Sequence, residues 1–194
     1  MKVSRIAIAV LAFAGAAGAQ QPAAPQANPI TAALKGRILA SHRVIAQSFD
    51  SIPASKFDYK PTPAQLSIGY IAQHVASDSY LFCNTFGAMK ADAADMDEST
   101  PDSVKAKWPK EKLVAKLKTS FAFCAKAIDQ LTDASLAEGV SFTYMGNTRN
   151  TTRINMALGH ALDLADHYSQ LANYMRLNNL IPASALPRPK PGAN

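Results

Sequence analysis

The sequence predicts an all-α domain, a four-helix bundle with a long loop or a short hairpin between its third and fourth helices. Four long segments carry apolar residues at spacings of three and four, which is typical of amphipathic helices. The strand signal is weak and confined to the connection between the last two segments. Facing helices of such a bundle supply the side chains of cofactor sites.

The first expected helix begins at Asn28 and Pro29, a plausible cap and first turn, and ends near residue 51, before Pro53. Its apolar residues recur at helical spacings. They are Ile30, Leu34, Ile38, Val44, Ile45, Phe49 and Ile52. His42 lies on this helix without a comparable partner, so we expect it at the surface.

The second expected helix begins at residues 62–65, which match a capping box with Pro63 at the first helical position. An apolar stripe carries it to about Met89. The stripe consists of Leu66, Ile68, Tyr70, Ile71, Val75, Leu81 and Phe82. His74 and Asp78 lie on this helix, four residues apart.

An acidic connection over residues 91–107, with room for one helical turn, leads to the third expected helix. That helix begins at Trp108 and Pro109 and continues to about Leu131. Residues 132–149 form the loop, or a short hairpin around residues 140–144.

The fourth expected helix has its cap at Asn150 or Thr151 and ends near Leu177. Its expected apolar side consists of Ile154, Leu158, Leu162, Ala165, Leu171 and Tyr174.

The first nineteen residues are typical of a secretory signal peptide, with a positive start, an apolar run and small residues up to Ala19. We therefore expect an exported protein, periplasmic or secreted, whose mature chain begins near Gln20. A flexible leader (20–28), the bundle (29–182) and a proline-rich tail (183–194) follow. No other run is long enough for stable membrane insertion.

Without the first nineteen residues the formal net charge falls from +6 to +4, which is mild, and the lysines alternate with apolar residues instead of forming a block. This pattern argues against nucleic acid as a partner. The two cysteines, Cys83 and Cys124, favour a disulfide in an oxidising compartment. Such a bond would stabilise the fold by about 4 kcal/mol in the chain-entropy model. The alternative is a pair of buried free thiols.

Asp163 and His167 indicate a metal site, because side chains four residues apart on a helix lie on one face, about 6 Å apart. His160 falls on the same face, two turns from His167. That separation of roughly 10 Å is too large for both histidines to bind one ion.

Two anchors resemble the DinB-like (DinB/YfiT) superfamily across nearly the whole mature chain. The first is Lys60, Pro61, Thr62 with the run from Ser67 to Val75, which contains His74; the second is the run from Asp166 to Leu171, followed by Tyr174, Met175, Arg176, Ile181 and Pro182. The resemblance implies an up-down-down-up bundle in which three histidines hold a divalent metal, often nickel or zinc. His74 matches the first of these ligands and His167 the last.

Asp163 stands where the resemblance implies the middle histidine. A carboxylate binds divalent metals well, and two imidazoles with one carboxylate suit zinc or non-haem iron. Our interpretation is therefore a site of His74, Asp163 and His167 for Zn, Ni or Fe. The alternatives are a shifted site that pairs His160 with Asp163, and a degenerate site without metal. Asp78 either orients His74 or is a solvated surface acid.

These residues favour a metal-dependent hydrolase or transferase that acts on a small molecule. The resemblance includes thiol transferases and a thiol-dependent isomerase, which use cytosolic thiols, so export favours hydrolysis or another transfer. The alternative is a non-catalytic metal-binding, ligand-binding or structural bundle with a degenerate site. Oxygen chemistry at ferrous iron is a third hypothesis. The resemblance also implies a possible homodimer.

Overall fold

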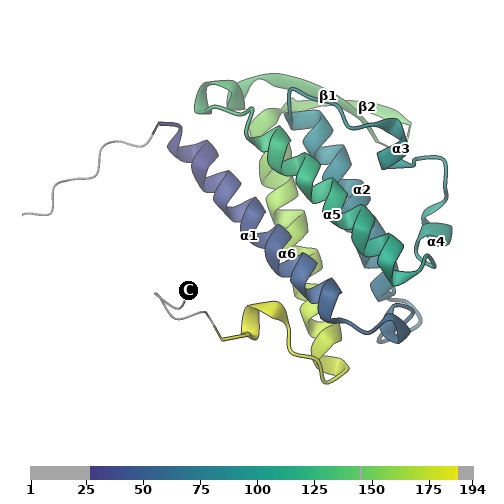
Figure 1. The fold of residues 1–194 in the computed structure, drawn as a ribbon. Helices are drawn as coiled ribbons and strands as arrows, with labels where there is room; N and C mark the ends of the chain where they lie inside the picture. Colours follow the sequence, from purple (N-terminus) through teal and green to yellow (C-terminus); the bar gives the residue numbers. More distant parts are fainter. Residues whose placement is uncertain (1–26, 145, 188–194) are drawn as a thin grey trace, which may run out of the picture.

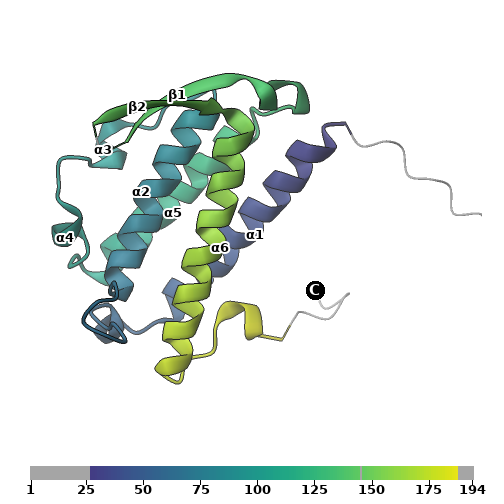
Figure 2. The ribbon, with the colours of Figure 1, turned by 180° about the vertical axis from the view of Figure 1, so that it is seen from behind.

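The computed structural model describes residues 27–144 and 146–187. Four long helices lie side by side: α1 (Pro29–Ser51), α2 (Ile68–Phe86), α5 (Lys110–Ile128) and α6 (Arg153–Leu177) (Figures 1 and 2). The expectation of a mostly helical fold is confirmed. The expected signal peptide, most of the leader and the last residues of the tail lie outside the described residues.

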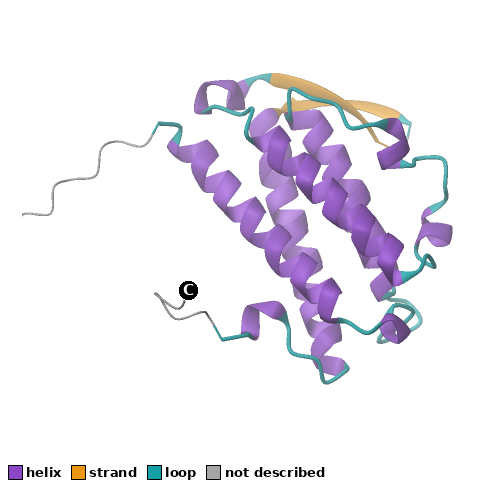
Figure 3. Cartoon of the chain, in the orientation of Figure 1, coloured by secondary structure: helices purple, strands orange, loops and turns teal. Residues whose placement is uncertain are grey.

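A two-stranded antiparallel sheet crosses one end of these helices, so the fold is not purely helical (Figure 3). It consists of β1 (Gly139–Tyr144) and β2 (Asn147–Thr152), with Gly139 opposite Thr152 and Tyr144 opposite Asn147. Val140 and Phe142 pack against the core while Ser141 and Thr143 are exposed, which is the alternation of a half-buried strand. Of the two connections expected here, the structure has the hairpin.

Short elements complete the connections. The acidic segment after α2 holds two four-residue helices, α3 (Ala93–Met96) and α4 (Asp102–Lys105). Three 3-10 turns cover Ala54–Lys56 (η1), Asp133–Ala137 (η2) and Ala183–Ala185 (η3). Within the described residues, no helix has the length and apolarity needed to cross a bilayer.

The first turn of α1 is capped from outside the helix. Asn28 makes no side-chain cap at this terminus. The carboxylate of Asp133 instead accepts hydrogen bonds from the backbone N–H groups of Ile30 (3.1 Å) and Thr31 (2.7 Å). These N–H groups lack partners within the helix, so Asp133 satisfies them and fixes η2 against α1.

The second helix starts later than the sequence predicts. Residues 62–65 form a turn, and α2 begins at Ile68 after Ser67, whose side chain accepts a hydrogen bond from the N–H of Tyr70 (3.1 Å). The N–H groups of Ile68 and Gly69 bind carbonyls of the preceding turn, at Tyr59 and Phe57. Because of these contacts, the chain turns back before α2 begins. The helix also ends earlier than predicted, at Phe86 instead of Met89.

The inward face of α6 differs from the expected one. Leu158 and Leu162 are 46% and 63% exposed, whereas Ala157, His160 and Ala161 are buried. The helix packs against both α1 and α2, and small residues allow such close approach on the inner face. The expected apolar side was therefore wrong at Leu158, Leu162 and Ala165, which are exposed.

A disulfide joins α2 to α5. Cys83 and Cys124 are both fully buried, and their Cα atoms are 5.3 Å apart. The structure places the two cysteines at disulfide distance, as the predicted pairing requires.

Candidate metal centre

Helices α2 and α6 bring together the side chains that the sequence selects as ligands. His74 and Asp78 lie on α2, and Asp163 and His167 lie on α6. Each pair spans four residues and therefore shares one helix face. The His74 ring lies beside the His167 ring, and Asp78 interacts with Asp163, so the two helices run in opposite directions here.

The four donor groups converge on one point. Each residue offers one ligand atom, and the four atoms all lie within 4.8 Å of one another. His74 Nε2 is 3.3 Å from Asp78 Oδ2, and His167 Nε2 is 3.3 Å from Asp163 Oδ1. The two imidazole centroids are 4.8 Å apart with the rings nearly perpendicular.

The group is half-buried, and its electrostatics reflect that position. Burial, together with the carboxylate of Asp163, raises the pKa of Asp78 to about 6, although both histidines act in the opposite direction. Burial tends to lower the pKa of His167, but the hydrogen bond and the charge of Asp163 outweigh it, so the pKa is raised. Two carboxylates held this close repel each other unless a proton or a cation lies between them.

Two polar atoms of the group have no hydrogen-bond partner among the described residues, namely Asp163 Oδ2 and His167 Nδ1. Buried polar atoms normally have partners, so a partner outside the protein chain is the simplest explanation. Two imidazoles and two carboxylates are a donor set that suits zinc and other divalent metals. The residues present therefore fit a divalent ion.

The position of Asp78 excludes one of the two expectations for it. Its side chain is 21% exposed, so it is not a solvated surface acid. Its Oδ2 is 3.3 Å from Nε2 of His74, where a carboxylate can either orient the ring or share in binding an ion. This geometry groups Asp78 with the donor atoms.

A cavity of about 530 Å³ opens beside the group. It lies between α2, the segment of α3 and α4, and the hairpin. Asp78 is the one member of the group that lines it, and the buried Lys105 and the aromatic Phe142 are also on its wall. The hairpin thus forms one wall of the cavity that Asp78 lines.

Tyr70 lies beside the candidate metal centre, although the sequence did not identify it as part of a site. Its ring centroid is 5.9 Å from that of His74, and burial, with the charges of Asp102 and Asp78, raises its pKa. The available signal was its spacing, because Tyr70, His74 and Asp78 follow one another at intervals of four residues on α2.

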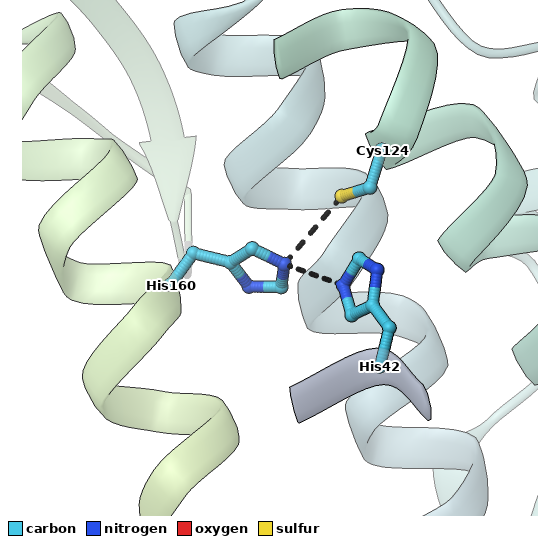
Figure 4. Close-up of side chains that lie close together, drawn as sticks. All are labelled: His42, Cys124 and His160. Carbon is cyan, nitrogen blue, oxygen red and sulfur yellow. Dashed lines mark hydrogen bonds between the residues drawn. The ribbon is translucent and has the colours of Figure 1, made fainter. Parts of the chain in front are cut away.

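His160 does not join this group. It is fully buried and lies beside His42 and Cys124 instead (Figure 4). Among the described residues, His160 and Asp163 belong to different groups of possible ligands, so the expected alternative that pairs them is not seen. His42 is 6% exposed, so the expectation that it lies at the surface was wrong.

No protein-family model matches this chain, and no curated protein matches it in sequence. Solved structures do resemble it. YjoA, a DinB-like protein from Bacillus subtilis, aligns with a TM-score of 0.56 and 18% identity, over 76% of this chain and 92% of that chain. This chain has a DinB-like fold.

Two other solved structures, one of them DinB-like, are also similar to this chain. One from Bacillus cereus has a TM-score of 0.56 at 13% identity and covers 73% of this chain and 88% of that chain. A mutant of the mycothiol-dependent maleylpyruvate isomerase has a TM-score of 0.55 at 9% identity, over 74% of this chain and 60% of that chain. The predicted resemblance is confirmed at the level of the DinB-like fold.

Proposed function

We propose that this protein is a metal-dependent hydrolase or transferase of a small molecule, with a divalent ion held by His74, Asp163 and His167. Asp78 lies between the ion and the cavity. In this proposal the four long helices form the bundle that carries the site, which is the arrangement that the resemblance implies. The convergence of four donor atoms from two helices within 4.8 Å is the observation that carries this proposal.

The residues have distinct roles in this proposal. A bound divalent ion lowers the pKa of a water or thiol ligand and so supplies a nucleophile at neutral pH. Asp78 faces the cavity and is placed either as a further ligand or as the acceptor of the proton that this nucleophile loses. Phe142 of the hairpin lines the same cavity as Asp78 and would form part of the wall around a bound small molecule.

Zinc is the ion that we favour, with nickel and iron as the other candidates. Nitrogen and oxygen donors without sulfur suit all three, and zinc does not require a redox partner. Among the similar structures, the isomerase is mycothiol-dependent. We propose hydrolysis, or transfer to an acceptor other than a cytosolic thiol, because the signal-like N-terminus points to export.

Three further expectations stay proposals. Export predicts that the mature chain recovered from the periplasm or medium begins near Gln20, which N-terminal sequencing would test. A homodimer predicts twice the chain mass by light scattering. The bound partner is a small molecule and not nucleic acid.

Metal analysis of purified protein, followed by assays with small esters and electrophiles, tests the proposal. We expect near-stoichiometric metal in the native chain and loss of metal in His74→Ala and in His167→Ala, with helical circular dichroism retained. Asp166→Asn, an exposed neighbour on α6, is the matched control and should keep its metal. A metal-free native protein that takes up no added Zn²⁺, Ni²⁺ or Fe²⁺ would refute the site.

A further inference from the structure

The cavity beside the candidate metal centre has a buried ammonium group in its wall. The cavity volume of about 530 Å³ suits a small molecule. Lys105 lines this cavity and is only 3% exposed, whereas Lys90 and Glu98 on the same wall are exposed. A charge held away from water is screened less than an exposed one, so Lys105 has the stronger effect on a molecule inside the cavity.

Close packing between α2 and α4 holds Lys105 in this position. Lys105 is the last residue of α4, and Ala106 follows it. A Cβ atom added to Gly69 on α2 would lie 2.4 Å from the carbonyl oxygen of Ala106. The glycine therefore allows the end of α4 to lie directly against α2, and the Lys105 side chain is buried instead of extending into solvent.

The protein itself satisfies the Lys105 ammonium poorly. The group has three N–H donors. Among the described residues it donates to Asp102 Oδ1 alone, over 3.4 Å, which is long for a hydrogen bond. The Asp102 side chain is 48% exposed, so water weakens this ion pair. A buried lysine normally has a close partner, and an anionic group in the cavity would be one.

We propose that this cavity binds small carboxylates through Lys105, and that the substrate of the proposed hydrolase or transferase carries such a carboxylate. The second half of this statement rests on the proposed function, whereas binding at Lys105 rests on the cavity alone. Asp78, which belongs to the candidate metal centre, lines the same cavity. A molecule anchored by its carboxylate at Lys105 would therefore extend along the wall towards the ion.

The charges around the cavity favour a ligand with a single negative charge. Asp78, Glu98 and Asp102 all lie on its wall. Their carboxylates would repel a second negative charge on the ligand, and the single charge of Lys105 would not balance it. A monocarboxylate therefore fits better than a doubly charged phosphate.

NMR titration of the native chain with butyrate and with butyramide tests the proposal, because the two probes are similar in size and differ in charge. We expect butyrate to shift the backbone amide signals of Thr85 and Phe142, which line the cavity on α2 and on the hairpin. Butyramide should bind roughly tenfold more weakly or less, because it lacks the charge that strengthens the hydrogen bond. Inorganic phosphate should also bind more weakly than butyrate.

Substitutions of Lys105 identify the binding group. Lys105→Met keeps the length of the side chain and removes its charge, so it should weaken butyrate binding roughly tenfold or more. Lys105→Arg should retain most of the binding. Lys107→Met, at an exposed position two residues further on, is the matched control and should bind butyrate as the native chain does. Circular dichroism and metal content should be unchanged in all three variants.

A His74→Ala/His167→Ala variant separates this proposal from the proposed function. Butyrate bound by Lys105 should remain bound when these metal ligands are removed. A native chain that takes up no metal but binds butyrate through Lys105 would refute the metal centre and support the carboxylate site. Butyrate binding that is lost in the double variant but unchanged in Lys105→Met would show that the ion holds the carboxylate, which overturns the role of Lys105.

Other results would also overturn the proposal. Equal affinity for butyrate and butyramide would show that the cavity does not recognise the charge, and tighter binding of phosphate would contradict the preference for a carboxylate. Should Lys105→Met unfold, the native chain decides: butyrate that does not shift the amide signals of Thr85 and Phe142 rejects the site.

Discussion

Asp163 occupies the position where the resemblance implies a histidine, and its surroundings suit a carboxylate ligand. Its Oδ1 is 3.3 Å from His167 Nε2, while its Oδ2 is buried without a partner among the described residues. Asp78 faces it from α2 and contributes to the same group of donor atoms. We infer that the carboxylate replaces the imidazole as a ligand.

Two substitutions of Asp163 distinguish a carboxylate that replaces the histidine as a metal ligand from a site that no longer binds metal. Asp163→His should retain bound metal, because it restores the histidine implied by the resemblance. Asp163→Asn should lower metal affinity roughly tenfold or more, because a neutral amide binds divalent ions poorly. Metal titration with a competing chelator measures both, with Asp166→Asn as the control. Unchanged affinity in Asp163→Asn would show that Asp163 is not a ligand.

Most residues of the candidate metal centre could be predicted from the sequence. His74, Asp163 and His167 were predicted from helical spacing and from the resemblance, and the structure brings them together. Spacing left the role of Asp78 open, because the approach of Asp163 and His167 to it depends on how α2 and α6 pack. Tyr70 was missed, because an aromatic residue in an apolar stripe is indistinguishable from a core residue in a sequence.

At the scale of elements, the start of α1 depends on a residue about one hundred positions away. The Asp133 carboxylate accepts hydrogen bonds from two N–H groups of the first turn and from the hydroxyl of Thr31 (2.8 Å). A negative charge at a helix N-terminus is also favourable to the helix dipole. Local sequence could not predict this cap, because its partner belongs to the turn after α5.

This cap predicts a pH dependence of stability. Desolvation tends to raise the pKa of Asp133, but the hydrogen bonds from Thr31 and Ile30 outweigh it, so the pKa is lowered. A carboxyl whose pKa is lower in the folded state stabilises the fold above the unfolded pKa, and the effect is lost as pH falls through the folded pKa.

Asp133→Asn should therefore lower the Tm near neutral pH, and the difference from the native protein should shrink below about pH 4. Thermal unfolding followed by circular dichroism at several pH values measures this. Asp129→Asn, which removes an exposed ion pair with Lys35, serves as the control and should change Tm less. A difference that is constant with pH would contradict the assigned role of the charge.

The sequence predicted where α6 ends, but it did not predict which face of α6 packs against the other helices. Its end near Leu177 was predicted from the apolar pattern, and the structure agrees. Which face lies inward depends on packing against α1 and α2. Leucines suggested the wrong face, because alanine contributes little to an apolar pattern yet allows the closest helix contact. His160, and with it His42, therefore lies inside the core.

At the scale of the whole molecule, the Cys83–Cys124 bond links two helices that are far apart in sequence. Its sequence separation of 41 residues corresponds to a stabilisation of about 4 kcal/mol in the chain-entropy model. The mostly helical fold and this pairing were predictable from the sequence. The cavity was not, because it is formed by α2, the hairpin and two four-residue helices.

Removing the disulfide should lower the free energy of unfolding accordingly. Cys83→Ser/Cys124→Ser should unfold at a lower denaturant concentration than the oxidised native chain, by about 4 kcal/mol in urea titration. The two serines also replace buried sulfur, so Cys83→Ala/Cys124→Ala is the second variant to compare. Equal stability of the oxidised native chain and the alanine variant would contradict a bracing role.

The central claim is that α2 and α6 together hold one divalent ion, and anomalous X-ray scattering from crystals of the oxidised protein tests it most directly. With Zn²⁺ bound, we expect an anomalous peak at about 2.0–2.2 Å from nitrogen or oxygen atoms of His74, Asp163 and His167. Crystals soaked in Zn²⁺ that show no peak between α2 and α6, with the four side chains in the same positions, would contradict it.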